Sequence, residues 1–303
     1  MAATAVAAAI TGCGLGAGAA TGGVRLDVTD DFGVRSLGES VVESAPGSET
    51  AMRQLERSHR VETRYGGRYV QSIDGLAGGT VAGRPVDWFY FVNGAEATVG
   101  ASDVTLKAGD SVWWDRRDWG AATHVSAVVG QWPEPFASTD GSGKRVEFEC
   151  VNPAEARAAC SAARNGLERT GARVETASAA HRGRPTTPRM LVGNWRALRR
   201  DPDVRQIELG PSVSGVYAIP AADGKSIALL GRDARVRRQL GEGSGLIAAI
   251  ANSKGGVTWV VTGVGKKGIE SAVGSLSEKN LNHKFAAVTH ADDTVEPAPE
   301  ISK

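Results

Sequence analysis

The chain has 303 residues, a formal net charge of +1 and 41% hydrophobic residues. This length suits two domains, and the composition is typical of a globular protein. A net charge so close to zero gives no basis for binding nucleic acid through overall charge, and no run of about 18 apolar residues predicts a membrane span.

The first 23 residues predict export and anchoring. Ile10-Thr11-Gly12-Cys13 follows an Ala/Val run and resembles a bacterial lipobox, in which Cys13 is lipidated. Residues 1–23 would then form a lipoprotein signal and a Gly-rich tether. The predicted location is extracytoplasmic, with a lipid anchor in a bacterial cell membrane. The alternative is an Ala-rich leader with a chance cysteine.

Residues 24–130 predict a first domain of strands with one helix. The helix is expected over Glu49–Arg57, with Ser48 as its N-cap. One helix against a mixed sheet is an α+β arrangement. Alternation and turn residues place the strands at Val24–Thr29, Val34–Val42, Val61–Tyr65, Tyr69–Ile73, Val86–Val92, Asp110–Trp114 and His124–Val129.

Residues 86–119 contain four of the seven tryptophans, Trp88, Trp113, Trp114 and Trp119. That is more indole than the core of a small sheet requires, so some rings are expected to face solvent or a flat ligand. Polar side chains nearby would complete the site. The predicted ligand-binding residues are Ser72, Asp74, Trp88, Tyr90, Asn93, Trp113 and Trp114.

Three motifs in this domain carry a resemblance to a known family. They are Tyr-Val-x-Ser-Ile-x-Gly (Tyr69–Gly75), Trp-x-Tyr-x-Val-Asn-Gly (Trp88–Gly94) and Leu-x-x-Gly-Asp-x-Val-Trp (Leu106–Trp113). Their order and spacing resemble the bacterial family related to the C-terminal domain of transcobalamin and intrinsic factor, over roughly residues 24–129. The resemblance implies a β-grasp fold and a soluble ligand, which is cobalamin, another corrinoid or a related molecule. The separate α-barrel of the vertebrate proteins has no counterpart here.

A Pro- and Ser/Gly-containing linker is expected over residues 131–144, and a second, α/β sandwich-type domain over residues 145–292. Residues 293–303 are expected to be a disordered tail. Helices are predicted at Pro153–Thr170, Arg232–Leu240, Gly245–Ala251 and Ile269–Leu276. Strands are predicted at Arg145–Cys150, Arg173–Ala177, Met190–Val192, Gln206–Leu209, Gly215–Ile219, Ser226–Leu230, Val257–Thr262 and Phe285–Val288.

Cys150 and Cys160 form an even pair once Cys13 is set aside, and a disulfide between them would fix the second domain's first helix to its strand. The alternative is two buried thiols. No CxxC motif and no histidine cluster is present, so no metal site is expected.

Two further segments have a possible chemical role. Residues 263–268 spell GxGxxG between a predicted strand and a predicted helix, with Asp292 and Asp293 beyond the next strand. The motif indicates a nucleotide or anion site, or a simple Gly-rich turn. Ser178–Arg200 contains six arginines and no acid, which is typical of a solvated surface. The alternative is a basic stripe that meets phosphate or an anionic surface.

Together these observations predict a non-enzymatic, surface-anchored lipoprotein. It would bind a small soluble ligand, such as cobalamin or another corrinoid, and deliver it to a transporter for uptake. No other cofactor is expected. One alternative is a structural or adhesive envelope protein without a ligand. A third is an exported enzyme that uses the loop at residues 263–268.

Overall fold

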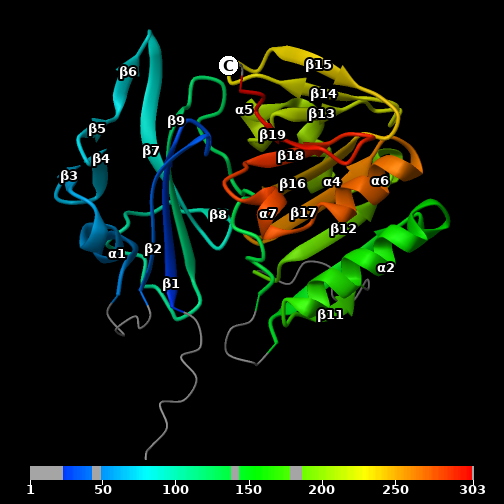
Figure 1. Ribbon diagram of the computed structural model, residues 1–303, viewed down its shortest axis with the longest axis horizontal. Helices are drawn as coiled ribbons and strands as arrows, with labels where there is room; N and C mark the ends of the chain where they lie inside the picture. The colour runs from blue at the N-terminus through cyan, green and yellow to red at the C-terminus, as the bar shows by residue number, and fades with distance from the viewer. Residues whose placement is uncertain (1–22, 43–48, 138–142, 178–185, 302–303) are drawn as a thin grey trace, which may run out of the picture.

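The computed structural model describes residues 23–42, 49–137, 143–177 and 186–301 (Figure 1). Cys13 and Ser48 lie outside these ranges, as do Arg182 and Arg184 of the arginine-rich segment. Within the described ranges the fold is mixed α/β, with more strand than helix. No helix there is long and apolar enough to cross a membrane.

The first half of the chain forms a mixed sheet in the order β2-β1-β9-β7-β6, with β8 paired to β7. β1 and β9 run parallel, and the other neighbours run antiparallel. Helix α1 (Ala51–Ser58) and a small sheet, β3 to β5, cover one face, and Thr50 caps α1. The strand bounds are β1 Val24–Asp30, β2 Arg35–Val42, β3 Val61–Arg64, β4 Tyr69–Ile73, β5 Leu76–Ala77, β6 Gly79–Val81, β7 Arg84–Val92, β8 Ala95–Glu96 and β9 Ser111–Asp118.

The second half forms a seven-stranded sheet in the order β11-β10-β12-β17-β16-β18-β19, with the first four strands parallel. A three-stranded sheet, β13 to β15, packs near it. The strands are β10 Arg145–Val151, β11 Arg173–Thr176, β12 Arg189–Gly193, β13 Ala218–Pro220, β14 Ile227–Leu230, β15 Val236–Leu240, β16 Gly245–Ala251, β17 Val257–Gly263, β18 Ala286–Thr289 and β19 Val295–Ala298. The helices are α2 Pro153–Arg169, α3 Trp195–Leu198, α4 Pro202–Arg205, the 3-10 helix η1 Gln206–Leu209, α5 Pro211–Ser214, α6 Gly265–Gly274 and α7 Glu278–Leu281.

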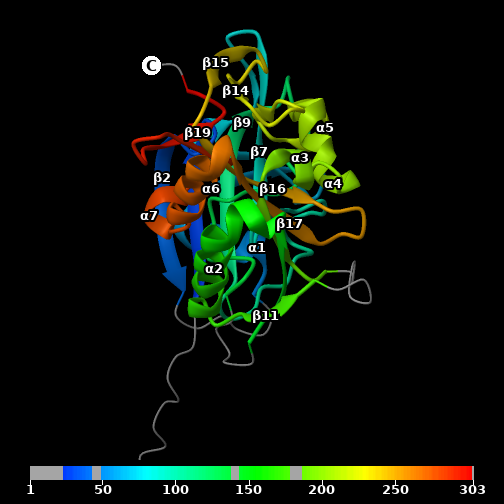
Figure 2. The same cartoon turned by 90° about the vertical axis from the view of Figure 1, so that its right-hand side faces the viewer.

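Both faces of the seven-stranded sheet are covered. Ile247 and Ala249 of β16 share a core with α2 and α6, whereas Leu246, Ala248 and Ile250 share the other core with α3, α4 and the three-stranded sheet. In Figure 2, α2 and α6 lie on one side of the sheet and α3 to α5 on the other. The disulfide between Cys150 and Cys160 is confirmed, and it joins β10 to α2.

The structure corrects several predicted elements. Residues 245–251 are a central strand, not a helix, because a strand buried on both faces is apolar at every position. Residues 236–240 form β15 where a helix was predicted, and residues 206–209 form a 3-10 turn where a strand was predicted. His124–Val129 contributes a single bridge, Ala95 to Ala127, and no strand.

Two segments predicted to be unstructured are ordered parts of the fold. Trp132 and Phe136, inside the predicted linker, are buried against Trp259 of β17. The predicted tail contains β19, which pairs with β18 at the edge of the sheet. The two halves therefore pack into one body, and Phe32, Trp113 and Phe285 lie in one continuous core.

Candidate metal centre

The aromatic side chains predicted to form an open wall are packed inside the protein. Trp88, Tyr90, Trp113 and Trp114 are each at most 7% exposed. The expectation that these rings face solvent is therefore wrong. The rings divide between two cores: Trp88, Tyr90 and Trp114 belong to the core over α1, whereas Trp113 and Phe91 belong to the core shared with the second half of the chain.

The reason lies in how the sheet is covered. The expectation that some rings face solvent treats one face of this sheet as core and the other face as open. In the structure the second half of the chain covers that other face, and Phe285 packs on Trp113 with ring centroids 5.1 Å apart. The extra indole fills a second core, so the rings leave no flat surface for a ligand.

The polar residues predicted for the same site have structural partners. Ser72 donates a hydrogen bond to Glu62, and Asp74 accepts one from the backbone N–H of Arg60. The hydrogen bond with His59 is the largest cause of the lowered pKa of Asp74. Asn93 connects two turns, because its side chain bonds both Asp110 and the backbone N–H of Ser111. Tyr90 and Trp114 do lie together, with ring centroids 4.6 Å apart, but inside the core.

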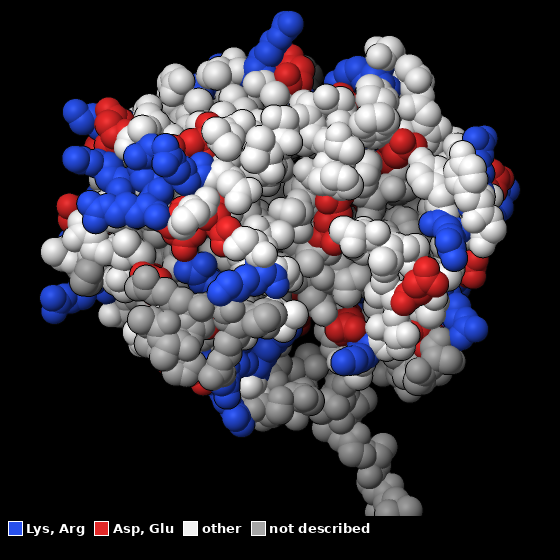
Figure 3. All heavy atoms as spheres, turned by 180° about the vertical axis from the view of Figure 1, so that it is seen from behind, with Lys and Arg blue, Asp and Glu red and all other residues white. Residues whose placement is uncertain are grey.

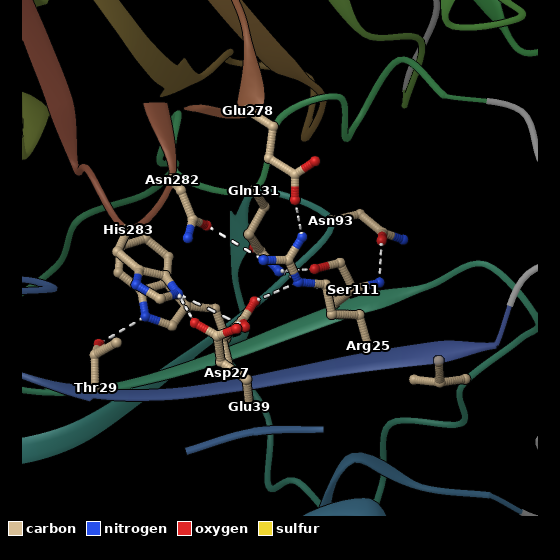
Figure 4. Close-up of polar contacts among 12 residues, drawn as sticks. Arg25, Asp27, Thr29, Glu39, Asn93, Ser111, Gln131, Glu278, Asn282 and His283 are labelled. Carbon is tan, nitrogen blue, oxygen red and sulfur yellow. Dashed lines mark hydrogen bonds and ion pairs between the residues drawn. The ribbon is translucent and has the colours of Figure 1, made fainter. Parts of the chain in front are cut away.

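A different cluster forms where the two halves meet (Figure 4). Asp27 of β1 and Glu39 of β2 are direct partners in the antiparallel register, so their side chains lie on the same face. His283 follows α7 and reaches this face from the second half. Its Nε2 lies 3.6 Å from Oδ1 of Asp27 and 3.9 Å from Oε1 of Glu39. One oxygen or nitrogen of each residue lies within 4.8 Å of the others.

Two of these atoms are buried without a hydrogen-bond partner. The side chains of Asp27 and His283 are 3% and 11% exposed. Asp27 Oδ1 and His283 Nε2 make no hydrogen bond within the described ranges. Buried polar atoms are nearly always paired, because an unpaired one costs about 1–3 kcal/mol. Glu39 is exposed, so the cluster opens to solvent on that side.

The other oxygen of Asp27 is held by Arg25, whose Nε lies 3.0 Å away. Burial lowers the pKa of Arg25, but Asp27 and Glu278 together raise it above its ordinary value. Arg25 also contacts Glu278 and Asn282 beside α7. This pairing fixes Oδ2 and leaves Oδ1 directed at His283.

Close backbone packing positions His283. Its N–H donates to the carbonyl of Gly130, and its ring lies 5.8 Å from the ring of Trp113. Gly33, in the turn between β1 and β2, has φ +80, and a Cβ there would lie 1.9 Å from the carbonyl oxygen of His283. A glycine is therefore required for the β1–β2 turn to approach His283 this closely.

Sequence reasoning missed all three residues and predicted no metal site. The pairing of Asp27 with Glu39 follows from a hairpin with known register, so a signal for two of them was present. His283 gave no signal, because only the packing of the two halves brings it to β1.

The GxGxxG segment does lie between a strand, β17, and a helix, α6. Its glycines are explained by close packing. A Cβ on Gly263 would lie 2.2 Å from the backbone of Gly268, and one on Gly268 would lie 2.2 Å from the carbonyl oxygen of Ser244. Beside Gly265 the space is taken by the carboxylate of Glu242. This carboxylate already supplies negative charge at the start of α6, so it disfavours the binding of another anion there.

A family model described as "Domain of unknown function (DUF4430)" matches residues 48–117. This span lies within the region of the resemblance described above. Among solved structures, the chain is similar to a candidate metal binding protein from Ruminococcus gnavus. The two are 14% identical with a TM-score of 0.25, and the match covers 32% of this chain and 97% of the other. No curated protein matches the chain.

Proposed function

We propose that this protein binds a divalent metal ion, Zn²⁺ in the first place, through Asp27, Glu39 and His283. The observation that carries the proposal is the buried pair of Asp27 Oδ1 and His283 Nε2, which face each other without a hydrogen bond. Imidazole nitrogens and carboxylate oxygens both bind zinc, and three protein ligands leave a fourth position for water or a further ligand.

The separations between the donor atoms suit an ion at their centre. Zinc bonds of about 2.0–2.1 Å in a tetrahedral site place neighbouring donor atoms about 3.3 Å apart. The observed 3.6 and 3.9 Å are close to that value. They exceed the 2.7–2.9 Å that is typical of a direct charge-assisted hydrogen bond. A small inward movement of the exposed Glu39 would complete the site.

The wider role follows from the sequence. We propose a non-enzymatic binding protein outside the cytoplasm, anchored through Cys13, with a β-grasp fold over residues 24–129. The disulfide between Cys150 and Cys160 supports an oxidising compartment. A tethered protein of this kind is suited to capture a metal ion for uptake, with a transporter as partner. Cobalamin binding would require an exposed surface of aromatic rings. Because these rings are buried, we propose a metal ion as the ligand in place of a corrinoid.

Isothermal titration of the metal-free protein with Zn²⁺ tests this function. We expect one ion per chain, an affinity at least tenfold lower for Glu39→Gln, and no specific binding for His283→Gln. Glu56→Gln is the matched control, because it removes an exposed carboxylate of α1 that is not among the three proposed ligands. It should bind zinc as the parent does.

Circular dichroism of each variant shows whether it is folded before titration. A parent protein that binds no zinc would refute the proposal and favour an adhesive envelope protein without a ligand. Equal zinc affinity in the parent, Glu39→Gln and His283→Gln would also refute it, because the ion would then bind elsewhere.

A further inference from the structure

A second candidate site lies in the other half of the molecule, at the carboxyl ends of β10 and β12. These strands are parallel neighbours. The chain leaving β10 forms α2 on one face of the sheet and returns to β11. The chain leaving β12 crosses to the opposite face through α3 to α5. It next enters the sheet at β16, which lies on the far side of β17 from β12. In open α/β sheets, ligands bind where neighbouring strands diverge in this way.

The molecule is hollowed at this point. A cavity of about 1180 Å³ is lined by the ends of β10 and β12, the start of α6 and the β13–β14 turn. We call it the switch-point crevice. The cavity is large enough for a small organic molecule.

Basic side chains dominate the wall formed by α3 and the β13–β14 turn. Arg196, Arg200 and Lys225 line the crevice and are exposed, and no ion pair of theirs is found within the described ranges. The fourth basic residue, Arg199, is held by Glu208 through two hydrogen bonds. In Figure 3, which shows the molecule from behind, basic side chains gather on the second half of the chain.

The acidic side chains of the crevice lie mainly on its other wall. Glu155 of α2 accepts a hydrogen bond from Asn194, and the carboxylate of Glu242 lies beside Gly265 at the start of α6. Asp223 accepts a hydrogen bond from the backbone N–H of Lys225. An anion is therefore favoured beside α3, where Arg196 lies within the helix and Arg200 lies two residues beyond its end.

The backbone at the crevice has two unusual features. Asn152, at the end of β10, has φ +56 and precedes α2 without capping it through its side chain. Its amide is therefore not used as a cap. Gly224 in the β13–β14 turn has φ +70 and lies beside α3, since a Cβ there would be in ordinary van der Waals contact with Cγ of Arg196 at 3.4 Å. The turn and α3 thus form one wall.

We propose that the switch-point crevice binds a small organic anion whose carboxylate or phosphate group is held by Arg196 and Arg200. Guanidinium groups bind both kinds of anion through paired hydrogen bonds. Lys225 adds charge from the adjoining β13–β14 turn, and the amide of Asn152 is placed to bind an uncharged part of the molecule. This site does not depend on the metal centre.

Titration of the full chain with inorganic phosphate and, separately, with citrate tests the proposal in metal-free buffer at low salt. We expect measurable binding of at least one probe, and at least a tenfold weaker affinity in the double variant Arg196→Gln with Arg200→Gln. Binding of phosphate alone would assign a phosphate group to the natural ligand, and binding of citrate alone would assign a carboxylate.

The matched control is Arg64→Gln with Arg68→Gln, which removes two exposed positive charges from the β3–β4 hairpin in the first half. It should bind the probe as the parent does. The proposal is overturned if the parent binds neither probe, or if the crevice variant binds as the parent does. An equal loss in both double variants also overturns it, because that result indicates overall charge attraction only.

Discussion

Phe285 is the side chain that most directly joins the two halves of the molecule. It is 3% exposed, and its ring centroid lies 5.1 Å from that of Phe32, 5.6 Å from Phe91 and 5.1 Å from Trp113. All three neighbours belong to the first half. Truncation of a buried phenylalanine to alanine costs about 3–5 kcal/mol, and each aromatic pair adds about 0.5–1.5 kcal/mol beyond its buried area.

Phe285→Ala should therefore lower the free energy of unfolding by about 4–5 kcal/mol. Urea unfolding followed by tryptophan fluorescence measures this change. Because a loss of that size approaches the total stability of many domains, Phe285→Leu provides a second value, expected to be about 1–2 kcal/mol. Val236→Ala, at a side chain 54% exposed, is the control and should change stability by less than about 0.5 kcal/mol.

The shared core also predicts that the two halves unfold in one transition. Loss of the Phe285 ring should shift the whole transition of the parent protein. A cost below about 1 kcal/mol for Phe285→Ala would show that the ring does not hold the junction. Two separate transitions, with only the second-half transition shifted by the variant, would contradict the single shared core.

Two further predictions concern stability. Burial raises the pKa of Glu134 to about 7, although Lys144 opposes the shift, so the native state binds this proton more tightly than the unfolded state. The favourable contribution of that proton is present at low pH and is lost as the pH rises from about 4.5 to about 7. Glu134→Gln should have the same unfolding free energy as the parent near pH 4 and a value up to about 3 kcal/mol higher near pH 8. Urea unfolding at both pH values measures the difference. Equal unfolding free energies of the two proteins at both pH values would contradict the shift. Replacing Cys150 and Cys160 with alanine opens a loop with a sequence separation of 10 and should cost about 2–3 kcal/mol. The parent treated with reductant should lose a similar amount, and an unchanged midpoint in both samples would show that the bridge does not stabilise the fold.

Local patterns predicted the first half of the fold well. The run at 86–92 is rich in aromatic and β-branched residues and ends at Asn93-Gly94, and the structure has β7 there. Strong β propensity with a turn residue at positive φ leaves few alternatives. The disulfide was also predictable, because a short separation between a strand end and the following helix brings the two cysteines together.

The second half was harder to predict because burial on both faces removes the period-two pattern. GLIAAIA at residues 245–251 is apolar at nearly every position and contains three alanines, so it is equally compatible with a helix. Its neighbours β17 and β18 decide the outcome, and they come from later in the chain. The same limit applies to the rings of the first half, whose second cover is supplied by a distant segment.

The proposed metal centre shows what sequence reasoning lacks when a site depends on the contact between two halves. Direct ion pairing of Asp27 with a protonated His283 would be expected to close their distance to about 2.7–2.9 Å. The separation is 3.6 Å, and Glu39 approaches the same nitrogen at 3.9 Å. Burying two polar atoms without a hydrogen bond is costly, and a cation between them would satisfy both at once. The register of the hairpin and the close approach of Gly33 to His283 hold the three side chains around one point, which is the arrangement that a metal ion requires and a simple ion pair does not.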